Sequence, residues 1–151
     1  MNREKLAHHL LTLVGLATLL IALSACARTD PEKALRATIA EMEAAVKARE
    51  PAKLVGYLAP DFARSGEGGM NRDDARRTVA AVLLTNPNIY MNVSISELTI
   101  TGNTAMAKLV VVAGGGSGII PERAQSWNFT TRWRFDNNKW LVERADWTEL
   151  L

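Results

Sequence analysis

The hydrophobic pattern of this chain changes its period once, near Ile89, and the change limits the folds open to it. Before that point, apolar residues recur at helical spacings of four, three and four: Leu35, Ile39, Met42 and Val46. After it, apolar residues alternate with polar ones, as in a strand buried on one side: Met91, Val93 and Ile95. Helices followed by strands predict an α+β domain, with N-terminal helices packed on a curved antiparallel sheet.

Two helices are predicted ahead of the glycine-containing part of the chain. Asp30 suits the N-cap of a first helix that runs to about residue 49. Pro51 interrupts that pattern because proline cannot donate a helical hydrogen bond. Residues 53–58 then predict a short second helix, which Pro60 ends.

A third helix is predicted to begin at Asn71, a residue that suits an N-cap. Asp73 and Asp74 follow in its first turn, where carboxylates favour the helix dipole, so we interpret them as helix-start residues and not as metal ligands. The connection before this helix, residues 61–70, contains three glycines and is predicted to be rich in turns, with room for a short strand at 62–65.

The C-terminal half predicts a meander of four strands. After the strand that begins near Ile89, the expected strands cover residues 104–112, 123–135 and 139–147. The segment from Gly114 to Gly118 is interpreted as a flexible hairpin connection. It does not suit a phosphate-binding loop, because no Lys-Ser or Lys-Thr pair follows it and no helix begins there.

The first 25 residues predict a cleaved export signal. Arg3 and Lys5 form a positive start, an apolar run follows from Leu10 to Leu23, and small residues come next. A permanent membrane helix is the weaker interpretation, because spanning a bilayer takes about 20 apolar residues and charges return soon after the run.

The segment Leu23-Ser24-Ala25-Cys26 resembles a lipobox, the signal peptidase II site of bacterial lipoproteins. The resemblance implies that Cys26 becomes the N-terminus and carries acyl chains that anchor the protein in a membrane. Residues 26–29 are then a short lipidated tether, and residues 30–151 form one domain. Ala27 stands where an aspartate would suggest inner-membrane retention in the enterobacterial sorting pattern, so we expect an outer-membrane protein that faces the periplasm.

The residue inventory after Cys26 excludes several mechanisms. Both histidines, His8 and His9, lie in the leader, and Cys26 is the only cysteine. The mature chain therefore lacks the residues for a catalytic triad, a Cys-His pair, a histidine-ligated zinc site or an intrachain disulfide. Losing the leader removes two of 18 basic and one of 16 acidic side chains, so the mature chain is nearly neutral and does not suit nucleic acid. No cofactor or metal is predicted.

Four features of the mature chain together resemble the nuclear transport factor two-like superfamily, which includes SnoaL-like proteins. They are the segment Leu54-Val55-Gly56-Tyr57-Leu58-Ala59-Pro60-Asp61-Phe62, the glycine-containing connection after it, the third helix beginning near Asn71, and the terminal hairpin with Asn138-Lys139-Trp140-Leu141-Val142. The resemblance covers essentially all of residues 30–149. The resemblance implies a cystatin-like cone with a cavity between the helices and the concave side of the sheet. Members of the superfamily range from ketosteroid isomerases and polyketide cyclases to non-catalytic binding and assembly modules, so the resemblance alone does not choose a function.

Asp61 and Tyr57 are the candidate acid–base residues. A carboxylate and a phenol are the groups by which ketosteroid isomerases abstract a proton and stabilise an oxyanion, and the resemblance brings both to the helical side of the cone. The structural alternative is the more favoured one. Asp61 after Pro60 suits an ordinary turn, and Tyr57 at a helix end suits half-buried packing.

The candidate ligand-binding residues are mostly aromatic and lie on the last two strands: Trp127, Phe129, Trp133, Trp147 and Arg132. On the third strand the aromatic residues share one face and Arg132 and Arg134 the other. Simple alternation on the fourth strand places Trp140 and Val142 opposite Ala145 and Trp147. An aromatic ladder is more often core than cavity lining. The arginines, as charges on an exposed sheet face, are more often solvated or paired with Glu143 or Asp146 than free to bind an anion.

Two functions remain open from the sequence. The preferred one is a non-enzymatic envelope lipoprotein that binds a small apolar ligand or a protein partner. The alternative is a histidine-free isomerase, cyclase or hydratase that uses Asp61 and Tyr57. An enzyme requires at least two ionisable groups that point into the cavity, whereas an apolar cavity favours binding. A homodimer through the exposed sheet face is compatible with both.

Overall fold

The computed structural model describes residues 30–65, 69–116 and 123–150. The elements follow in chain order as α2 (Pro31–Lys47), α3 (Pro51–Val55), β1 (Leu58–Ala63), α4 (Arg72–Thr85), β2 (Asn88–Thr101), β3 (Thr104–Gly116), β4 (Arg123–Asp136) and β5 (Lys139–Leu150). The predicted export signal and the Cys26 tether lie outside the described residues. Pro31–Leu151 form one compact unit.

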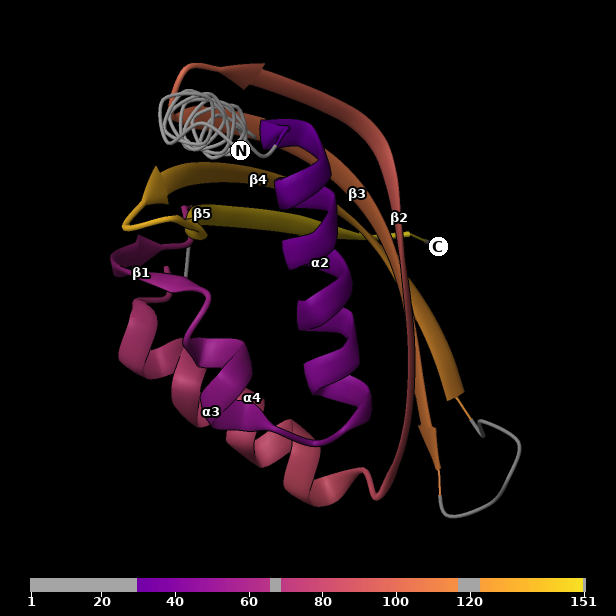
Figure 1. The fold of residues 1–151 in the computed structure, drawn as a ribbon. Coiled ribbons are helices and arrows are strands. Elements are labelled where there is room, and N and C mark those ends of the chain that lie inside the picture. The colour runs from indigo at the N-terminus through magenta and orange to yellow at the C-terminus, as the bar shows by residue number, and fades with distance from the viewer. Residues whose placement is uncertain (1–29, 66–68, 117–122, 151) are drawn as a thin grey trace, which may run out of the picture. The chain divides into compact units, whose positions relative to one another are not determined.

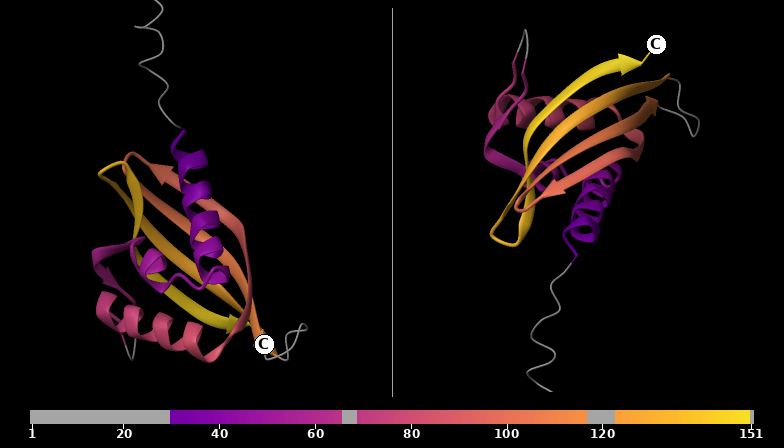
Figure 2. Two further views of the ribbon diagram at one scale, coloured as in Figure 1. Left: turned by 60° about the horizontal axis from the view of Figure 1, so that its bottom comes forward. Right: turned by 90° about the horizontal axis from the view of Figure 1, so that it is seen from above.

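The strands form one five-stranded sheet in the order β1-β5-β4-β3-β2. β1 pairs with β5 in parallel, and the other neighbours are antiparallel. Figures 1 and 2 show α2, α3 and α4 on the same, concave face of the curved sheet. The predicted α+β class, with N-terminal helices on a curved sheet, is confirmed.

The helix starts follow from local chemistry, and the second helix corrects the prediction. Asn71 accepts hydrogen bonds from the backbone N–H groups of Asp73 and Asp74 and forms a capping box with Asp74, as its N-cap role requires. The second helix begins at Pro51 and ends at Val55, earlier than residues 53–58. The chain then enters β1, which contains Pro60. This strand tolerates a proline because it lies at the edge of the sheet.

The first three residues of the predicted flexible loop, Gly114 to Gly116, belong to strand β3. For this triple-glycine segment the loop prediction is wrong. Gly114 and Gly115 pair with Tyr90 and Ile89 on β2, and Gly115 also pairs with Arg123 on β4. A Cβ atom on Gly115 would lie 2.6 Å from Asn86 Oδ1. Glycine at this position therefore lets the end of α4 approach the sheet.

A β-bulge at Glu143 changes which residues of β5 face the helices. Arg132 pairs with Arg144 but Trp133 pairs with Val142, so Glu143 is an extra residue with no partner on β4. The predicted simple alternation is therefore wrong across this point, because one inserted residue inverts the order of the faces. The residues buried or half-buried on the inner face are Trp140, Val142, Ala145 and Trp147.

The hydrophobic core lies between α2, α4 and the concave face. Trp133, Trp140 and Leu35 are the largest side chains that are almost fully buried. Ala105 and Ala107 on β3 are also buried in this core. All of these residues lie within the compact unit that starts at Pro31.

Candidate ligand cavity

A cavity of about 320 Å³ lies between the helices and the concave face of the sheet. All three helices, β1 and the four longer strands contribute side chains to its walls. Thr78 on α4 lines the cavity and is exposed, so the cavity is not sealed from solvent. The surface that the walls present to the cavity is apolar. A cavity of this size and character suits a small ligand.

Three of the predicted aromatic residues line this cavity: Phe129, Trp133 and Trp147. The rings of Phe129 and Trp147 stack across β4 and β5 with centroids 5.3 Å apart. The guanidinium of Arg64 lies 4.0 Å from the centroid of Trp147, in cation–π geometry. Trp147 is therefore held between Phe129 and Arg64.

The polar atoms of β4 nearest the cavity are paired with one another. Trp133 Nε1 donates to Thr131 Oγ1 at 2.8 Å, and Thr131 Oγ1 donates to the carbonyl oxygen of Ala107 at 3.0 Å. Thr131 has one hydroxyl proton, which is used in this chain. This part of the wall therefore offers a ligand apolar contacts and no free hydrogen-bond donor.

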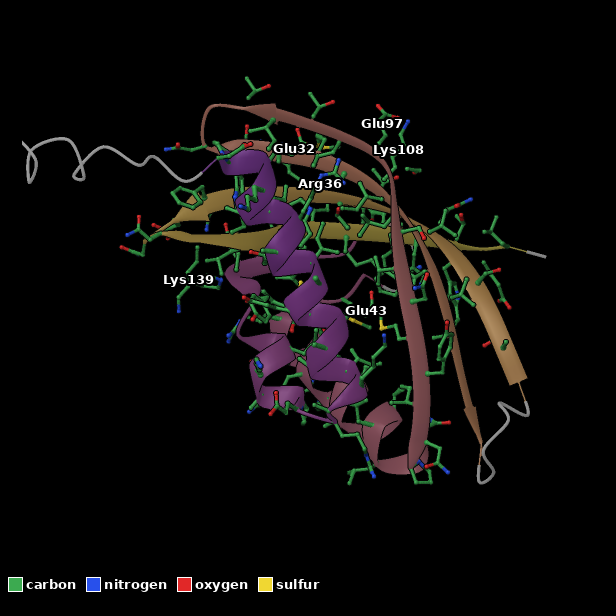
Figure 3. The ribbon with its side chains drawn as sticks, turned by 45° about the vertical axis from the view of Figure 1, so that its right-hand side comes forward. Glu32, Arg36, Glu43, Glu97, Lys108 and Lys139 are labelled. Carbon is green, nitrogen blue, oxygen red and sulfur yellow. The ribbon has the colours of Figure 1, made fainter. Side chains whose placement is uncertain are left out.

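Among the described residues, Glu43 is the one acidic or basic side chain of the cavity wall, and it was not predicted from the sequence. It lies on the side of α2 that faces the free edge of β2 (Figure 3). Its Oε2 atom accepts a hydrogen bond of 3.1 Å from the backbone N–H of Val93, and its Oε1 atom pairs with Lys47. The carboxylate thus joins α2 to an edge strand. Glu43 directly follows Met42, a residue of the apolar helical pattern, and this position was the sequence signal that could have indicated a place near the cavity.

Tyr57 and Asp61 do not line the cavity. The hydroxyl of Tyr57 donates to Glu41 Oε2 at 2.8 Å. Burial, then the hydrogen bond to Glu41 and the nearby carboxylates, raise the pKa of Tyr57 to about 12. Asp61 is exposed and bonded to Arg134, whose guanidinium holds the pKa of the Asp61 carboxyl below its ordinary value. The structure does not bring the two residues together at the cavity.

The arginines of β4 are paired, as one of the two alternatives predicted. Arg132 Nε lies 3.3 Å from Glu143 Oε2, and Arg134 pairs with both Glu143 and Asp61. Neither arginine lines the cavity. Trp127, the remaining predicted binding residue, lines a smaller neighbouring pocket instead.

The fold of this chain is similar to that of several solved structures. The sequence matches no protein-family model and no curated protein. A protein from Novosphingobium aromaticivorans assigned as a scytalone dehydratase superposes with a TM-score of 0.71, at 15% identity over 80% of this chain and 84% of the other. An uncharacterised protein with a cystatin-like fold from Caulobacter vibrioides gives 0.64, at 18% identity over 80% and 89%.

A ketosteroid isomerase-like protein from Erwinia carotovora atroseptica is also similar, with a TM-score of 0.63 at 11% identity over 82% of this chain and 98% of the other. The chain has the NTF2-like, cystatin-like fold. NTF2-like is the short form of nuclear transport factor two-like, so the fold implied by the sequence resemblance is confirmed. At identities this low, the structural similarity establishes the fold alone. The function of the NTF2-like domain has to be argued from its own residues.

Two further findings on the described residues concern metal sites and membrane-spanning helices. Among residues 30–65, 69–116 and 123–150, no group of three or more His, Cys, Asp or Glu side chains is placed to hold a metal ion. Within those same ranges, no helix is long and apolar enough to cross a membrane.

Proposed function

We propose that this chain is a lipoprotein of the bacterial envelope whose NTF2-like domain binds a small apolar ligand without catalysing a reaction. The tether is Cys26, and the domain faces the periplasm from the outer membrane. The proposal joins two independent supports: the lipobox-like segment Leu23-Ser24-Ala25-Cys26 and the cavity described above.

The observation that carries the binding proposal is the apolar wall of the 320 Å³ cavity. Enzymes of the acid–base type need at least two ionisable groups aimed at the substrate. Here one carboxylate, Glu43, belongs to the wall, and both of its oxygens already have partners in Lys47 and the N–H of Val93. Such a wall stabilises an apolar molecule by removing its surface from water, about 25 cal/mol for each Å².

One observation supports the isomerase, cyclase or hydratase alternative: the chain shares its fold with proteins described as a scytalone dehydratase and as ketosteroid isomerase-like. This alternative requires Asp61 and Tyr57 to act on a substrate. Their bonds to Arg134 and Glu41, and their position outside the cavity wall, favour binding over this alternative. A protein partner in place of a small ligand remains the other form of the binding proposal.

The tether is tested with Cys26→Ser in the full chain, expressed in a diderm bacterium fed an alkyne-tagged palmitate. The parent chain is expected to take up the label and to sediment with outer membranes, and Cys26→Ser to lose both properties. Ala27→Ser is the matched control and is expected to behave as the parent does. Equal labelling of the parent and Cys26→Ser would contradict the proposal.

The cavity is tested with N-phenyl-1-naphthylamine, an apolar dye whose emission rises on burial. Val79 lines the cavity on α4, so Val79→Phe is expected to weaken dye binding about tenfold or more by filling the site. Leu84 on the same helix is 77% exposed, and Leu84→Phe is the control that leaves the cavity unchanged. Dye binding that is equal in both variants would show that the cavity is not the site.

A further inference from the structure

A second, smaller pocket of about 230 Å³ lies where α4 ends and β2 begins. Val82 and Asn86 from this end of α4 line it, together with Gln125 and Trp127 from β4. The triple-glycine segment of β3 forms its floor, and that floor carries no side chain at Gly114 and Gly115. We call this space the outer pocket and the 320 Å³ cavity the inner cavity.

The outer pocket lies beside the inner cavity along the same three strands, β2, β3 and β4. On each strand, a residue that lines the inner cavity stands two positions from one that lines the outer pocket: Met91 and Ile89 on β2, Val111 and Ala113 on β3, Phe129 and Trp127 on β4. Residues two apart on a strand point to the same side. From Trp133 to Trp127 the shared wall runs for about 20 Å at the rise of a strand.

The two spaces differ in chemistry. The inner cavity presents apolar surface, whereas the outer pocket also presents polar atoms. Two side-chain amides, Asn86 and Gln125, belong to its wall, and no charged residue does among the described residues. An apolar compartment beside an uncharged polar one suits a molecule with one apolar end and one neutral polar end.

The hydrogen bonds of the amides show which polar atom they offer. Asn86 Nδ2 donates to the carbonyl oxygen of Val82 at 2.9 Å and to Thr85 Oγ1 at 3.2 Å, so both of its hydrogens are used. Within the described part of the chain, no group donates to Asn86 Oδ1. Gln125 Nε2 donates to Glu149 Oε1 at 2.8 Å. One of the two Nε2 hydrogens of Gln125 has no acceptor among the described residues. The wall of the outer pocket therefore carries an amide oxygen that accepts no hydrogen bond from the described residues, on Asn86, and one amide hydrogen that is not donated, on Gln125.

We propose that the ligand is a neutral single-chain amphiphile whose hydrocarbon chain fills the inner cavity and whose hydrogen-bond-donating head, a hydroxyl or an amide, meets Asn86 Oδ1 in the outer pocket. The proposal rests on the binding function proposed above and adds the class and orientation of the ligand. A carboxylate head is disfavoured, because it brings a charge to a pocket whose described wall residues carry none.

The test uses the chain from Asp30 onward, which contains every core residue that the structure describes, with the naphthylamine dye as reporter. Three competitors of equal chain length displace the dye: dodecan-1-ol, its methyl ether and dodecanoate. The alcohol is expected to bind about fivefold to tenfold more tightly than the ether, the value of one hydrogen bond to an otherwise unpaired acceptor. Dodecanoate is expected to bind more weakly than the alcohol.

Asn86→Leu removes the acceptor at similar volume and is expected to abolish the preference for the alcohol while the ether binds as before. Gly115→Ala is the second variant, because its methyl group would lie 2.6 Å from Asn86 Oδ1 and displace that atom. Asn128→Leu, on the exposed outer face of β4, is the matched control. Thermal unfolding shows that each variant is folded.

The outcomes separate this proposal from the one on which it rests. Dye binding that Val79→Phe does not weaken would overturn the binding function itself. Cavity-dependent dye binding with equal affinities for alcohol and ether would overturn only the amphiphile proposal. A preference for dodecanoate, or an Asn86→Leu variant that weakens alcohol and ether equally, would overturn it as well.

Discussion

Arg134 holds Asp61 through two contacts that reach from β4 across β5 to β1: Nη2 donates to Oδ1 at 3.1 Å, and Nη1 to Oδ2 at 3.3 Å. Arg134 also pairs with Glu143, the bulged residue of the intervening strand. The residue with the strongest sequence case for catalysis is thus part of an ion-pair cluster that joins three strands on the outside of the domain. Its environment favours the ionised carboxylate and does not prepare it as a general base.

The Asp61 pair predicts a specific dependence on acid. Because Arg134 lowers the pKa of Asp61, the contribution of the pair to stability is present above the unfolded-state pKa near 3.9 and is lost as the pH falls through the lowered folded-state pKa. NMR titration of the Asp61 carboxyl carbon is expected to give a lowered midpoint that Arg134→Gln raises. Arg132→Gln is the control, since Arg132 pairs with Glu143 instead. A titration midpoint of Asp61 that is the same in the parent chain and in Arg134→Gln would contradict this prediction.

Tyr57 predicts a second pH dependence, at alkaline pH. Its pKa is raised from 10.0 to about 12, so the unfolded chain loses the phenolic proton first and stability falls as the pH rises between these values. Urea denaturation at pH 9, 10, 11 and 12 is expected to show this fall in the parent chain and in Tyr90→Phe, with a smaller fall in Tyr57→Phe. Identical pH profiles for all three chains would be inconsistent with the raised pKa.

Glu43 is expected to matter for stability more than a surface carboxylate does. Its side chain is 18% exposed and accepts from the N–H of Val93 on the free edge of β2. Glu43→Leu is expected to cost about 1 to 2 kcal/mol in the free energy of unfolding, and Glu43→Gln less, because the amide still accepts. In the control Glu97→Leu, loss of the exposed pair with Lys108 (Figure 3) is expected to cost less than about 1 kcal/mol. Equal losses from both leucine variants would contradict a role at the β2 edge.

The two buried tryptophans offer a matched comparison of one hydrogen bond. Trp133 and Trp140 are 1% and 2% exposed, but Trp133 Nε1 donates to Thr131 while Trp140 Nε1 is buried with no acceptor among the described residues. Trp133→Phe is therefore expected to destabilise the domain by about 1 kcal/mol more than Trp140→Phe, measured by chemical denaturation. The opposite order would show that packing, and not the hydrogen bond, dominates at these sites.

The homodimer expected through the outer sheet face remains a prediction. Tyr90 and Met106 are large apolar side chains on β2 and β3, 50% and 48% exposed. Light scattering on the chain from Asp30 onward is expected to give the mass of a dimer, and the double variant Tyr90→Glu/Met106→Glu that of a monomer. Leu84→Glu, on α4, is expected to leave the dimer intact. A monomeric parent chain would rule out this interface.

The class of the fold could be predicted from the sequence, because the signals for helices and strands are local. Helix starts depend on the cap residue and its neighbours, and Asn71 is the N-cap of α4, as predicted. The face shared by Phe129 and Trp133 follows from alternation along one strand. Signals of this kind are read from a few consecutive residues.

Tertiary structure alone decided the composition of the cavity wall. The bulge at Glu143 brings Trp147 to the same side as Trp140, and a bulge arises from pairing with a neighbouring strand. The packing of α2 beside the edge strand β2 brings Glu43 into the cavity wall. The pairing of β1 with β5 brings Asp61 within contact of Arg134. These outcomes depend on packing between segments far apart in the chain, which local periodicity does not encode.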